Sequence, residues 1–259
     1  MKTIAFATMK GGVGKTTLAF NLAGILSERS RVLLMDIDPQ CNLNQSVGLD
    51  LNTREGYTMG DIFESPKLDP DLVAIDIGKN MTILPGSIDL TVTEARLPSR
   101  AGKEFILQHY IEDHRDFFSR FDYLILDTSP SMSNVNQNGF VVADQIVLVS
   151  DVSLHSIRGA ELFLYLWQDI RDALRIPDNV KALVLNNYDS RTNLAKELTE
   201  FCCSKEELAP LLVDTVIPAR VAMKKTALEN IPASKLYPND GITIALRKVA
   251  AELTEKGVF

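Results

Sequence analysis

The chain has 259 residues, a formal net charge of −7 and a sequence pI near 5.1, so any contact with nucleic acid must come from a local basic patch. Its apolar and charged fractions of 46% and 24% are those of an ordinary globular protein, and its length suits one large α/β domain. The three cysteines include no C-x-x-C pair, which argues against a disulfide framework or a zinc site and favours a reducing cytosol.

Short apolar runs alternate along the chain with longer amphipathic runs. The expected strands are residues 3–8, 32–36, 81–84, 123–127, 145–150, 180–185 and 212–216. The expected helices are residues 16–28, 43–47, 88–97, 103–118, 134–143, 157–174, 192–201, 221–229 and 242–256. Near-continuous apolar strands that alternate with helices predict an α/β fold with a doubly wound, mostly parallel sheet covered on both faces. We expect a single domain over residues 1–259, with residues 50–79 as a surface excursion.

The first expected strand enters a glycine-rich turn, and a helical pattern follows at once. The turn reads Lys10, Gly11, Gly12, Val13, Gly14, Lys15, Thr16, Thr17. Strand, glycine loop and helix form the context of a phosphate-binding loop, in which backbone N–H groups and the helix N-terminus face an anion. The common pattern G-x-x-x-x-G-K-[ST] is broken by Met9, and a second lysine opens the loop. One triphosphate rarely needs two lysines from one loop, so this variant is the more specific signal. A chance glycine turn or a non-nucleotide anion site are the alternatives.

Aspartates follow two of the expected strands. Asp127 ends the run 123–127 in a Walker B arrangement, and Asp36 and Asp38 end the run that begins at residue 32. Strand ends of a doubly wound sheet meet at the ligand edge, and Mg²⁺ takes oxygen ligands. We therefore expect a magnesium–triphosphate site with Thr16, Asp36 and Asp127 on the metal side. An Asp-Pro turn without function is the alternative for the second aspartate run.

Three motifs together resemble the deviant Walker ATPases of the ParA/MinD group. They are the doubled-lysine loop at 10–17, Met-Asp-Ile-Asp-Pro-Gln at 35–40 and Leu-Asp-Thr-Ser-Pro-Ser at 126–131. The Asp-Pro-Gln form and the run 187–192 are more similar to ParA (Soj-type) partition proteins than to MinD. The resemblance spans most of the chain and implies a P-loop NTPase fold, ATP and Mg²⁺ as cofactors, and slow ATP hydrolysis that a partner stimulates.

The resemblance also implies individual roles. Lys15 would contact the β- and γ-phosphates, Thr17 the α-phosphate, and the whole loop from Lys10 to Thr17 would bind the nucleotide. Asn186 and Asn187, at a strand end, would face the adenine edge. Lys10 would cross to the nucleotide of a partner subunit, so that ATP lies between two protomers. Asp38 would position water, which makes Lys10, Lys15 and Asp38 the expected catalytic residues.

The implied activity is DNA partition. An ATP-bound homodimer would bind non-specific double-stranded DNA and would leave it when a ParB-like centromere-binding protein stimulates hydrolysis, in the cytoplasm and on the nucleoid. The family frequently reads Ile-Pro-Arg-Asn where this chain has Ile-Pro-Ala-Arg at 217–220. The expected DNA contacts are therefore Arg220, Lys224 and Lys225, with a solvated helix face as the alternative. The chain begins almost directly with its first strand, as we expect of members without operator binding.

Other functions on the same fold are the alternatives. A MinD-like or cargo-positioning ATPase would act on a protein or a membrane. We expect no stable membrane association, because the last helix has only a narrow apolar stripe, and Glu252 and Glu255 spoil the cationic face that a membrane-surface helix would need. The iron–sulfur branch of the fold is excluded, because no cysteine lies between Cys41 and Cys202. Cys41 stands where the family often has glycine, so either a small residue is tolerated there or the position is redox-sensitive.

Overall fold

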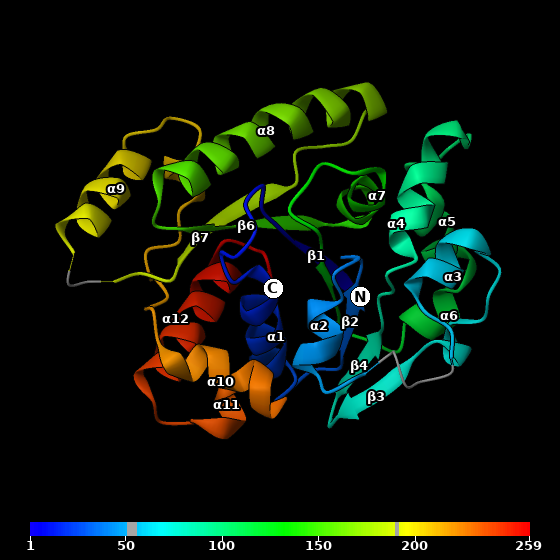
Figure 1. Cartoon of the computed structure of the whole chain (residues 1–259), viewed down its shortest axis with the longest axis horizontal. Coiled ribbons are helices and arrows are strands. Elements are labelled where there is room, and N and C mark those ends of the chain that lie inside the picture. The colour runs from blue at the N-terminus through cyan, green and yellow to red at the C-terminus, as the bar shows by residue number, and fades with distance from the viewer. Residues whose placement is uncertain (51–55, 190–191) are drawn as a thin grey trace.

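A seven-stranded sheet lies at the centre of the computed structural model, which describes residues 1–50, 56–189 and 192–259 (Figure 1). Across the described chain the strand order is β3-β4-β2-β5-β1-β6-β7. The strands are β1 (Lys2–Ala7), β2 (Val32–Asp36), β3 (Ile75–Gly78), β4 (Met81–Leu84), β5 (Tyr123–Asp127), β6 (Gln145–Asp151) and β7 (Val180–Asn186). All neighbours pair in parallel except β3, which is antiparallel to β4. The predicted doubly wound, mostly parallel sheet is confirmed.

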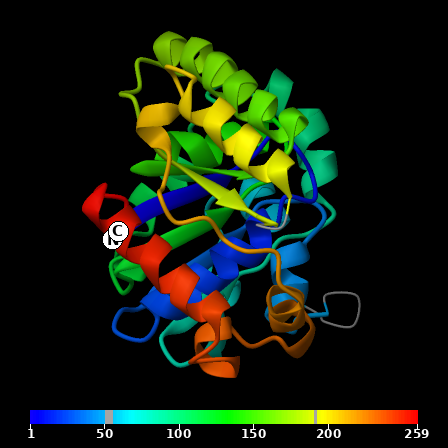
Figure 2. The same ribbon diagram turned by 90° about the vertical axis from the view of Figure 1, so that its left-hand side faces the viewer.

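Helices cover both faces of this sheet. They are α1 (Lys15–Leu26), α2 (Asn42–Ser46), α3 (Met59–Glu64), α4 (Leu90–Arg96), α5 (Ile106–Asp113), α6 (Arg115–Phe118), α7 (Asn134–Val142), α8 (Leu154–Leu174), α9 (Asn193–Cys203), α10 (Val221–Glu229), α11 (Ala233–Leu236) and α12 (Gly241–Glu255). Figure 2 shows α8 and α9 above the sheet, with α1 and the red α12 below it.

The core is divided into two layers by the period-2 alternation of strand side chains. Along β1, Ala5 and Ala7 belong to the cluster that packs under α3 to α9, whereas Ile4 and Phe6 belong to the cluster under α1, α10 and α12. The apolar stripe predicted for the last helix is confirmed. Ile242, Leu246, Val249, Ala250 and Leu253 are all buried, on a helix that contacts α1.

Three expectations about elements are wrong. Residues 212–216 form no strand, because the chain bends beside β7 where Thr215 donates to Glu252, and only a single bridge joins Leu212 to β7. The helix expected at 103–118 is divided at His114 into α5 and α6. The excursion expected at 50–79 contains β3 and also α3, which starts with a capping box between Thr58 and Asp61. Residues 51–55 of that excursion and residues 190–191 of the run 187–192 lie outside the described residues.

Candidate functional site

The phosphate-loop prediction corresponds to the turn between β1 and α1. Gly12 and Gly14 have φ angles of 82° and 81°, and Gly14 is the N-cap of α1. A Cβ at position 14 would lie 2.5 Å from Nδ2 of Asn186, so both the backbone conformation and the close neighbour require glycine there. The structure therefore presents the backbone of this turn bare, as a phosphate cradle must.

The two asparagines at the end of β7 brace this loop. Asn186 is buried and donates from Nδ2 to the carbonyl of Val13 at 2.8 Å, and Asn187 donates to the same carbonyl at 3.3 Å. Both also line the cavity beside the loop. Their expected contact with adenine stays a prediction, and their described contacts are with the loop.

Asp127 lies at the centre of the metal side. It is fully buried at the end of β5, where it accepts a hydrogen bond from the Thr16 hydroxyl at 2.6 Å and forms an ion pair with Lys15. Lys15 is itself buried. The loop lysine, the loop hydroxyl and the Walker B carboxylate are thus brought together as predicted. Hydroxyl and carboxylate oxygens are ligands that Mg²⁺ prefers, so these side chains fit a magnesium–nucleotide complex.

Asp36 lies beside Asp127 in the sheet register and is equally buried. It has no exposed surface, and its carboxylate accepts the backbone N–H groups of Asp38 at 3.1 Å and of Asn44 at 3.2 Å. Burial, reinforced by the negative charge of Asp127, raises the pKa of Asp36 well above its usual range. Its described partners are backbone groups, and its predicted place on the metal side stays a prediction.

Asp38 opens into the cavity that the phosphate loop lines. The residue is 4% exposed, and its carboxylate accepts the Gln40 N–H at 2.9 Å. Burial raises the pKa of Asp38 above its usual value, although the hydrogen bond from the Gln40 N–H and the nearby Lys15 charge oppose the change. A carboxylate with a raised pKa beside a phosphate cradle can orient water and accept its proton.

Lys10 does not bond to its own loop through its ammonium group. The Nζ atom donates to Asp151 at 2.9 Å and to the Ser153 hydroxyl at 3.0 Å, at the end of β6 and the N-cap of α8. Burial would raise the pKa of Asp151, but hydrogen bonds from Ser153 and Lys10 outweigh it and hold that pKa below its usual value. The sequence-based prediction did not include Asp151 and Ser153. Asp151 ends a strand as Asp36 and Asp127 do, and that position was the available signal.

The phosphate loop opens onto a cavity of about 720 Å³ whose far wall is α10. Arg220 and Lys224, which were expected on a DNA surface, line this cavity together with Lys15 and Asp38. Lys225 is exposed on the same helix and is not among the lining residues. The structure thus separates the three cations that the sequence grouped.

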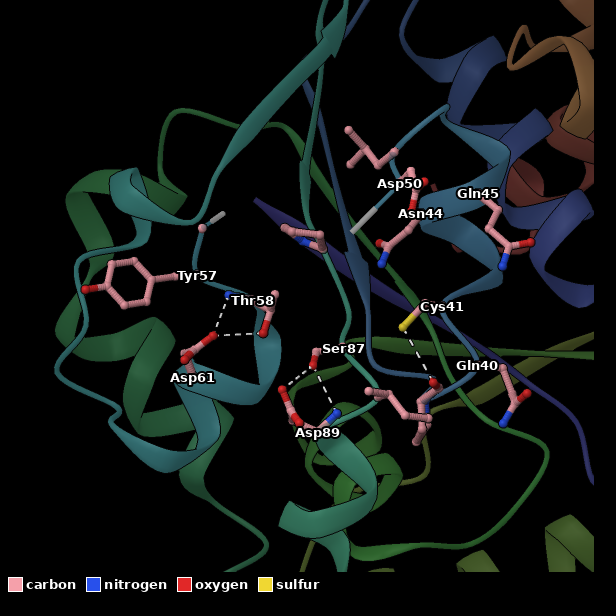
Figure 3. A pocket seen from close by; sticks show the side chains of 15 residues that line it. Gln40, Cys41, Asn44, Gln45, Asp50, Tyr57, Thr58, Asp61, Ser87 and Asp89 are labelled. Carbon is pink, nitrogen blue, oxygen red and sulfur yellow. Dashed lines mark hydrogen bonds between the residues drawn. The ribbon is translucent and has the colours of Figure 1, made fainter. Parts of the chain in front are cut away.

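A second cavity of about 740 Å³ adjoins the first and shares Gln40 and Gln45 with it (Figure 3). Cys41 lies on its wall with a positive φ of 52°, the conformation that suits the glycine the family often has here. Burial and the nearby carboxylates raise the pKa of Cys41 to about 12, and burial raises that of Cys202 to about 11. These two thiols are poor nucleophiles at neutral pH.

Iodoacetamide should therefore label the native protein selectively at pH 8. The exposed Cys203 should react first, whereas Cys41 and Cys202 should stay almost unmodified, because their thiolate fractions are about one in a thousand or less. Peptide mass spectrometry measures the three rates, and the denatured chain, in which all three should react, is the control. If Cys41 reacted as fast as Cys203, the position would qualify as redox-sensitive.

A parallel sheet, a glycine cradle with two lysines and strand-end carboxylates define the class of P-loop ATPases. Residues 1–181 match a family model described as an AAA domain. An uncharacterised protein of Mycobacterium tuberculosis is 31% identical over 98% of this chain and 79% of its own length. The chromosome-partitioning ATPase Soj of Treponema pallidum is 25% identical over 98% of both chains.

One solved structure extends the comparison to ligands. The cobyrinic acid a,c-diamide synthase of Mycobacterium smegmatis, solved with an ATP analogue and magnesium, is 28% identical, has a TM-score of 0.84 and covers 98% of this chain and 94% of its own. The chain therefore belongs to the AAA-domain family, as a homologue of the ParA and Soj proteins. Its cofactors are ATP and Mg²⁺.

Proposed function

We propose that this ATPase is a DNA-partition switch. An ATP-bound homodimer binds non-specific double-stranded DNA on the nucleoid in the cytoplasm and leaves it when a ParB-like partner stimulates ATP hydrolysis. The observation that carries the proposal is the position of Lys10. Its ammonium group bonds to Asp151 and Ser153 rather than to its own loop, which supports a role toward a second protomer. The homology to a chromosome-partitioning ATPase supports the same reading.

The chemistry follows from the residues around the loop. Lys15 and the loop backbone bind the phosphates, Thr16 and Asp127 hold the metal side, and Asp38 orients the attacking water. Bound Mg²⁺ supplies positive charge to the phosphate oxygens. Asp36 stabilises the segment that carries Asp38, because its carboxylate accepts the backbone N–H of Asp38. Hydrolysis by such a site is slow until a partner completes the positioning, which suits a timer.

The DNA-facing element of the proposal is α10. It carries Arg220 at its N-cap and Lys224 and Lys225 in its first turns, all exposed, on a chain that is otherwise acidic. A membrane role is less favoured, because the apolar face of α12 packs inside the fold. No helix in the described part of the chain is both long enough and apolar enough to cross a bilayer.

Co-sedimentation with non-specific duplex DNA should occur with ATP and not with ADP or without nucleotide. Log Kobs should fall linearly with log salt concentration, with a slope of about −0.9 per phosphate contacted. A Lys10→Ala chain should still bind ATP but stay monomeric by light scattering and fail to sediment with DNA. Nucleotide-independent sedimentation, or ATP-dependent binding to anionic vesicles instead of DNA, would refute the proposed function in favour of a positioning switch on a membrane.

A further inference from the structure

Two cations of α10 share the face that borders the nucleotide cavity. Arg220 is the N-cap residue of α10, with extended backbone, and Lys224 lies in the helix four residues later. Both line the cavity that the phosphate loop lines. Lys225 is one residue further on, about 100° around the helix axis, and does not line it. The basic residues of α10 therefore face two different environments.

The charges in this cavity are unevenly paired. Lys15 forms its ion pair with Asp127 and Lys10 with Asp151. Within the described ranges, neither Arg220 nor Lys224 forms an ion pair. A nucleotide triphosphate is strongly anionic, so two unpaired cations on the wall of its cavity are suited to the nucleotide itself.

Helix α10 is also hydrogen-bonded to two helices, one that follows the phosphate loop and one that follows Asp38. Asn21 of α1, the helix that follows the phosphate loop, donates to the Thr226 hydroxyl at 3.1 Å, and both residues are fully buried. Asn230, the C-cap of α10, donates to the carbonyl of Gln45 at 2.6 Å, in the helix α2 that follows Asp38. Figure 1 shows α10 in orange below α1. The helix is therefore connected at its middle to α1, which follows the phosphate loop, and at its end to α2, which follows Asp38.

From these contacts we propose that Arg220 and Lys224 contact the bound nucleotide. One side of α10 then lies against the nucleotide, whereas Lys225 points outward and contacts DNA. The nucleotide half of this proposal rests on ATP binding by the family. The DNA half rests on the proposed function. Arg220 and Lys224 thereby become nucleotide-binding residues, and the DNA contact of α10 is reduced to Lys225.

The nucleotide half is tested by measuring the dissociation constants of fluorescent ATP and ADP analogues by anisotropy. Arg220→Ala and Lys224→Ala should each weaken nucleotide binding about tenfold, the loss expected for one charge-assisted hydrogen bond. Lys248→Ala, which removes an exposed lysine on α12, is the matched control and should bind like the wild type. Circular dichroism monitors folding, and Lys224→Met, which keeps the apolar stem, replaces Lys224→Ala if that variant unfolds.

The DNA half is tested by the salt dependence of DNA binding at saturating ATP. Lys225→Ala should reduce the slope by about one per protomer, whereas Lys224→Ala should keep the wild-type slope. Nucleotide affinity of both Arg220→Ala and Lys224→Ala within twofold of the wild type would overturn the proposal, as would a flattened slope for Lys224→Ala. If the wild-type chain binds no DNA, the proposed function fails, while the nucleotide measurements still decide the role of Arg220 and Lys224.

Discussion

Replacing Lys15 by alanine should weaken ATP binding by more than about a hundredfold. The substitution removes the side chain expected at the β- and γ-phosphates, and it leaves the buried Asp127 carboxylate without its cation. An unpaired buried charge costs several kcal/mol, and a bound phosphate placed beside that carboxylate would be repelled. Isothermal titration calorimetry measures the loss directly.

Two controls make the Lys15 result interpretable. Thermal unfolding shows whether the variant is folded, because losing the partner of Asp127 also lowers the free energy of unfolding. Lys15→Ala combined with Asp127→Asn should regain stability but not ATP affinity, since the buried charge is gone while the phosphate contact is still missing. If the folded Lys15→Ala variant bound ATP within tenfold of the wild type, the assignment of residues 10–17 as the phosphate-binding loop would be refuted.

An Asp38→Asn chain should bind ATP and dimerise normally but hydrolyse ATP about a hundredfold more slowly, or worse. Asparagine keeps the oxygen that accepts the Gln40 N–H, so the local structure should persist. The amide cannot accept a proton from water, and general-base groups typically contribute 10²- to 10⁴-fold. Single-turnover hydrolysis and light scattering with ATP separate the chemical step from assembly.

The pH dependence gives an independent check on Asp38. Because burial raises its pKa, single-turnover hydrolysis by the wild-type chain should fall with decreasing pH sooner than an ordinary aspartate would allow, as the carboxylate gains a proton. The residual rate of Asp38→Asn should lack that step. Asp89→Asn, in the neighbouring cavity, should turn over normally. Normal turnover by Asp38→Asn would assign water positioning to another group.

Six of the seven strands in the described sheet, and the meeting of their acidic ends, could be predicted from the sequence, because buried parallel strands are short, apolar and bounded by turns, whereas the antiparallel β3 was not predicted. Asp36 and Asp127 were expected at strand ends on one edge of the sheet, and the structure places them opposite each other in the pairing of β2 with β5. The errors at residues 212–216 and 103–118 accompany two different kinds of contact. The bend at Thr215 lies at a hydrogen bond to the distant Glu252, whereas the break at His114 coincides with a local contact, in which the ring nitrogen donates to the Tyr110 carbonyl four residues earlier.

The parts of the candidate site that the sequence did not predict depend on tertiary placement. The partner of Lys10, Asp151, lies 141 residues away, so the sequence around Lys10 could not predict it. The split between Lys224 and Lys225 depends on how α10 is rotated, and that rotation is fixed by buried contacts such as Asn21 to Thr226. Composition showed that any DNA contact must be local but could not show which side of the helix makes it.

The ion pair between Lys10 and Asp151 gives the proposed assembly a concentration threshold. Each protomer must release its lysine before that lysine can serve the other, so the free energy of this pair enters the dimerisation constant twice. The pair is partly exposed and worth about 1 kcal/mol or less, or roughly fivefold per chain and about 25-fold for the dimer. Such a pair also weakens with added salt. The protein concentration at which dimers form would then be set by two modest surface contacts as well as by ATP.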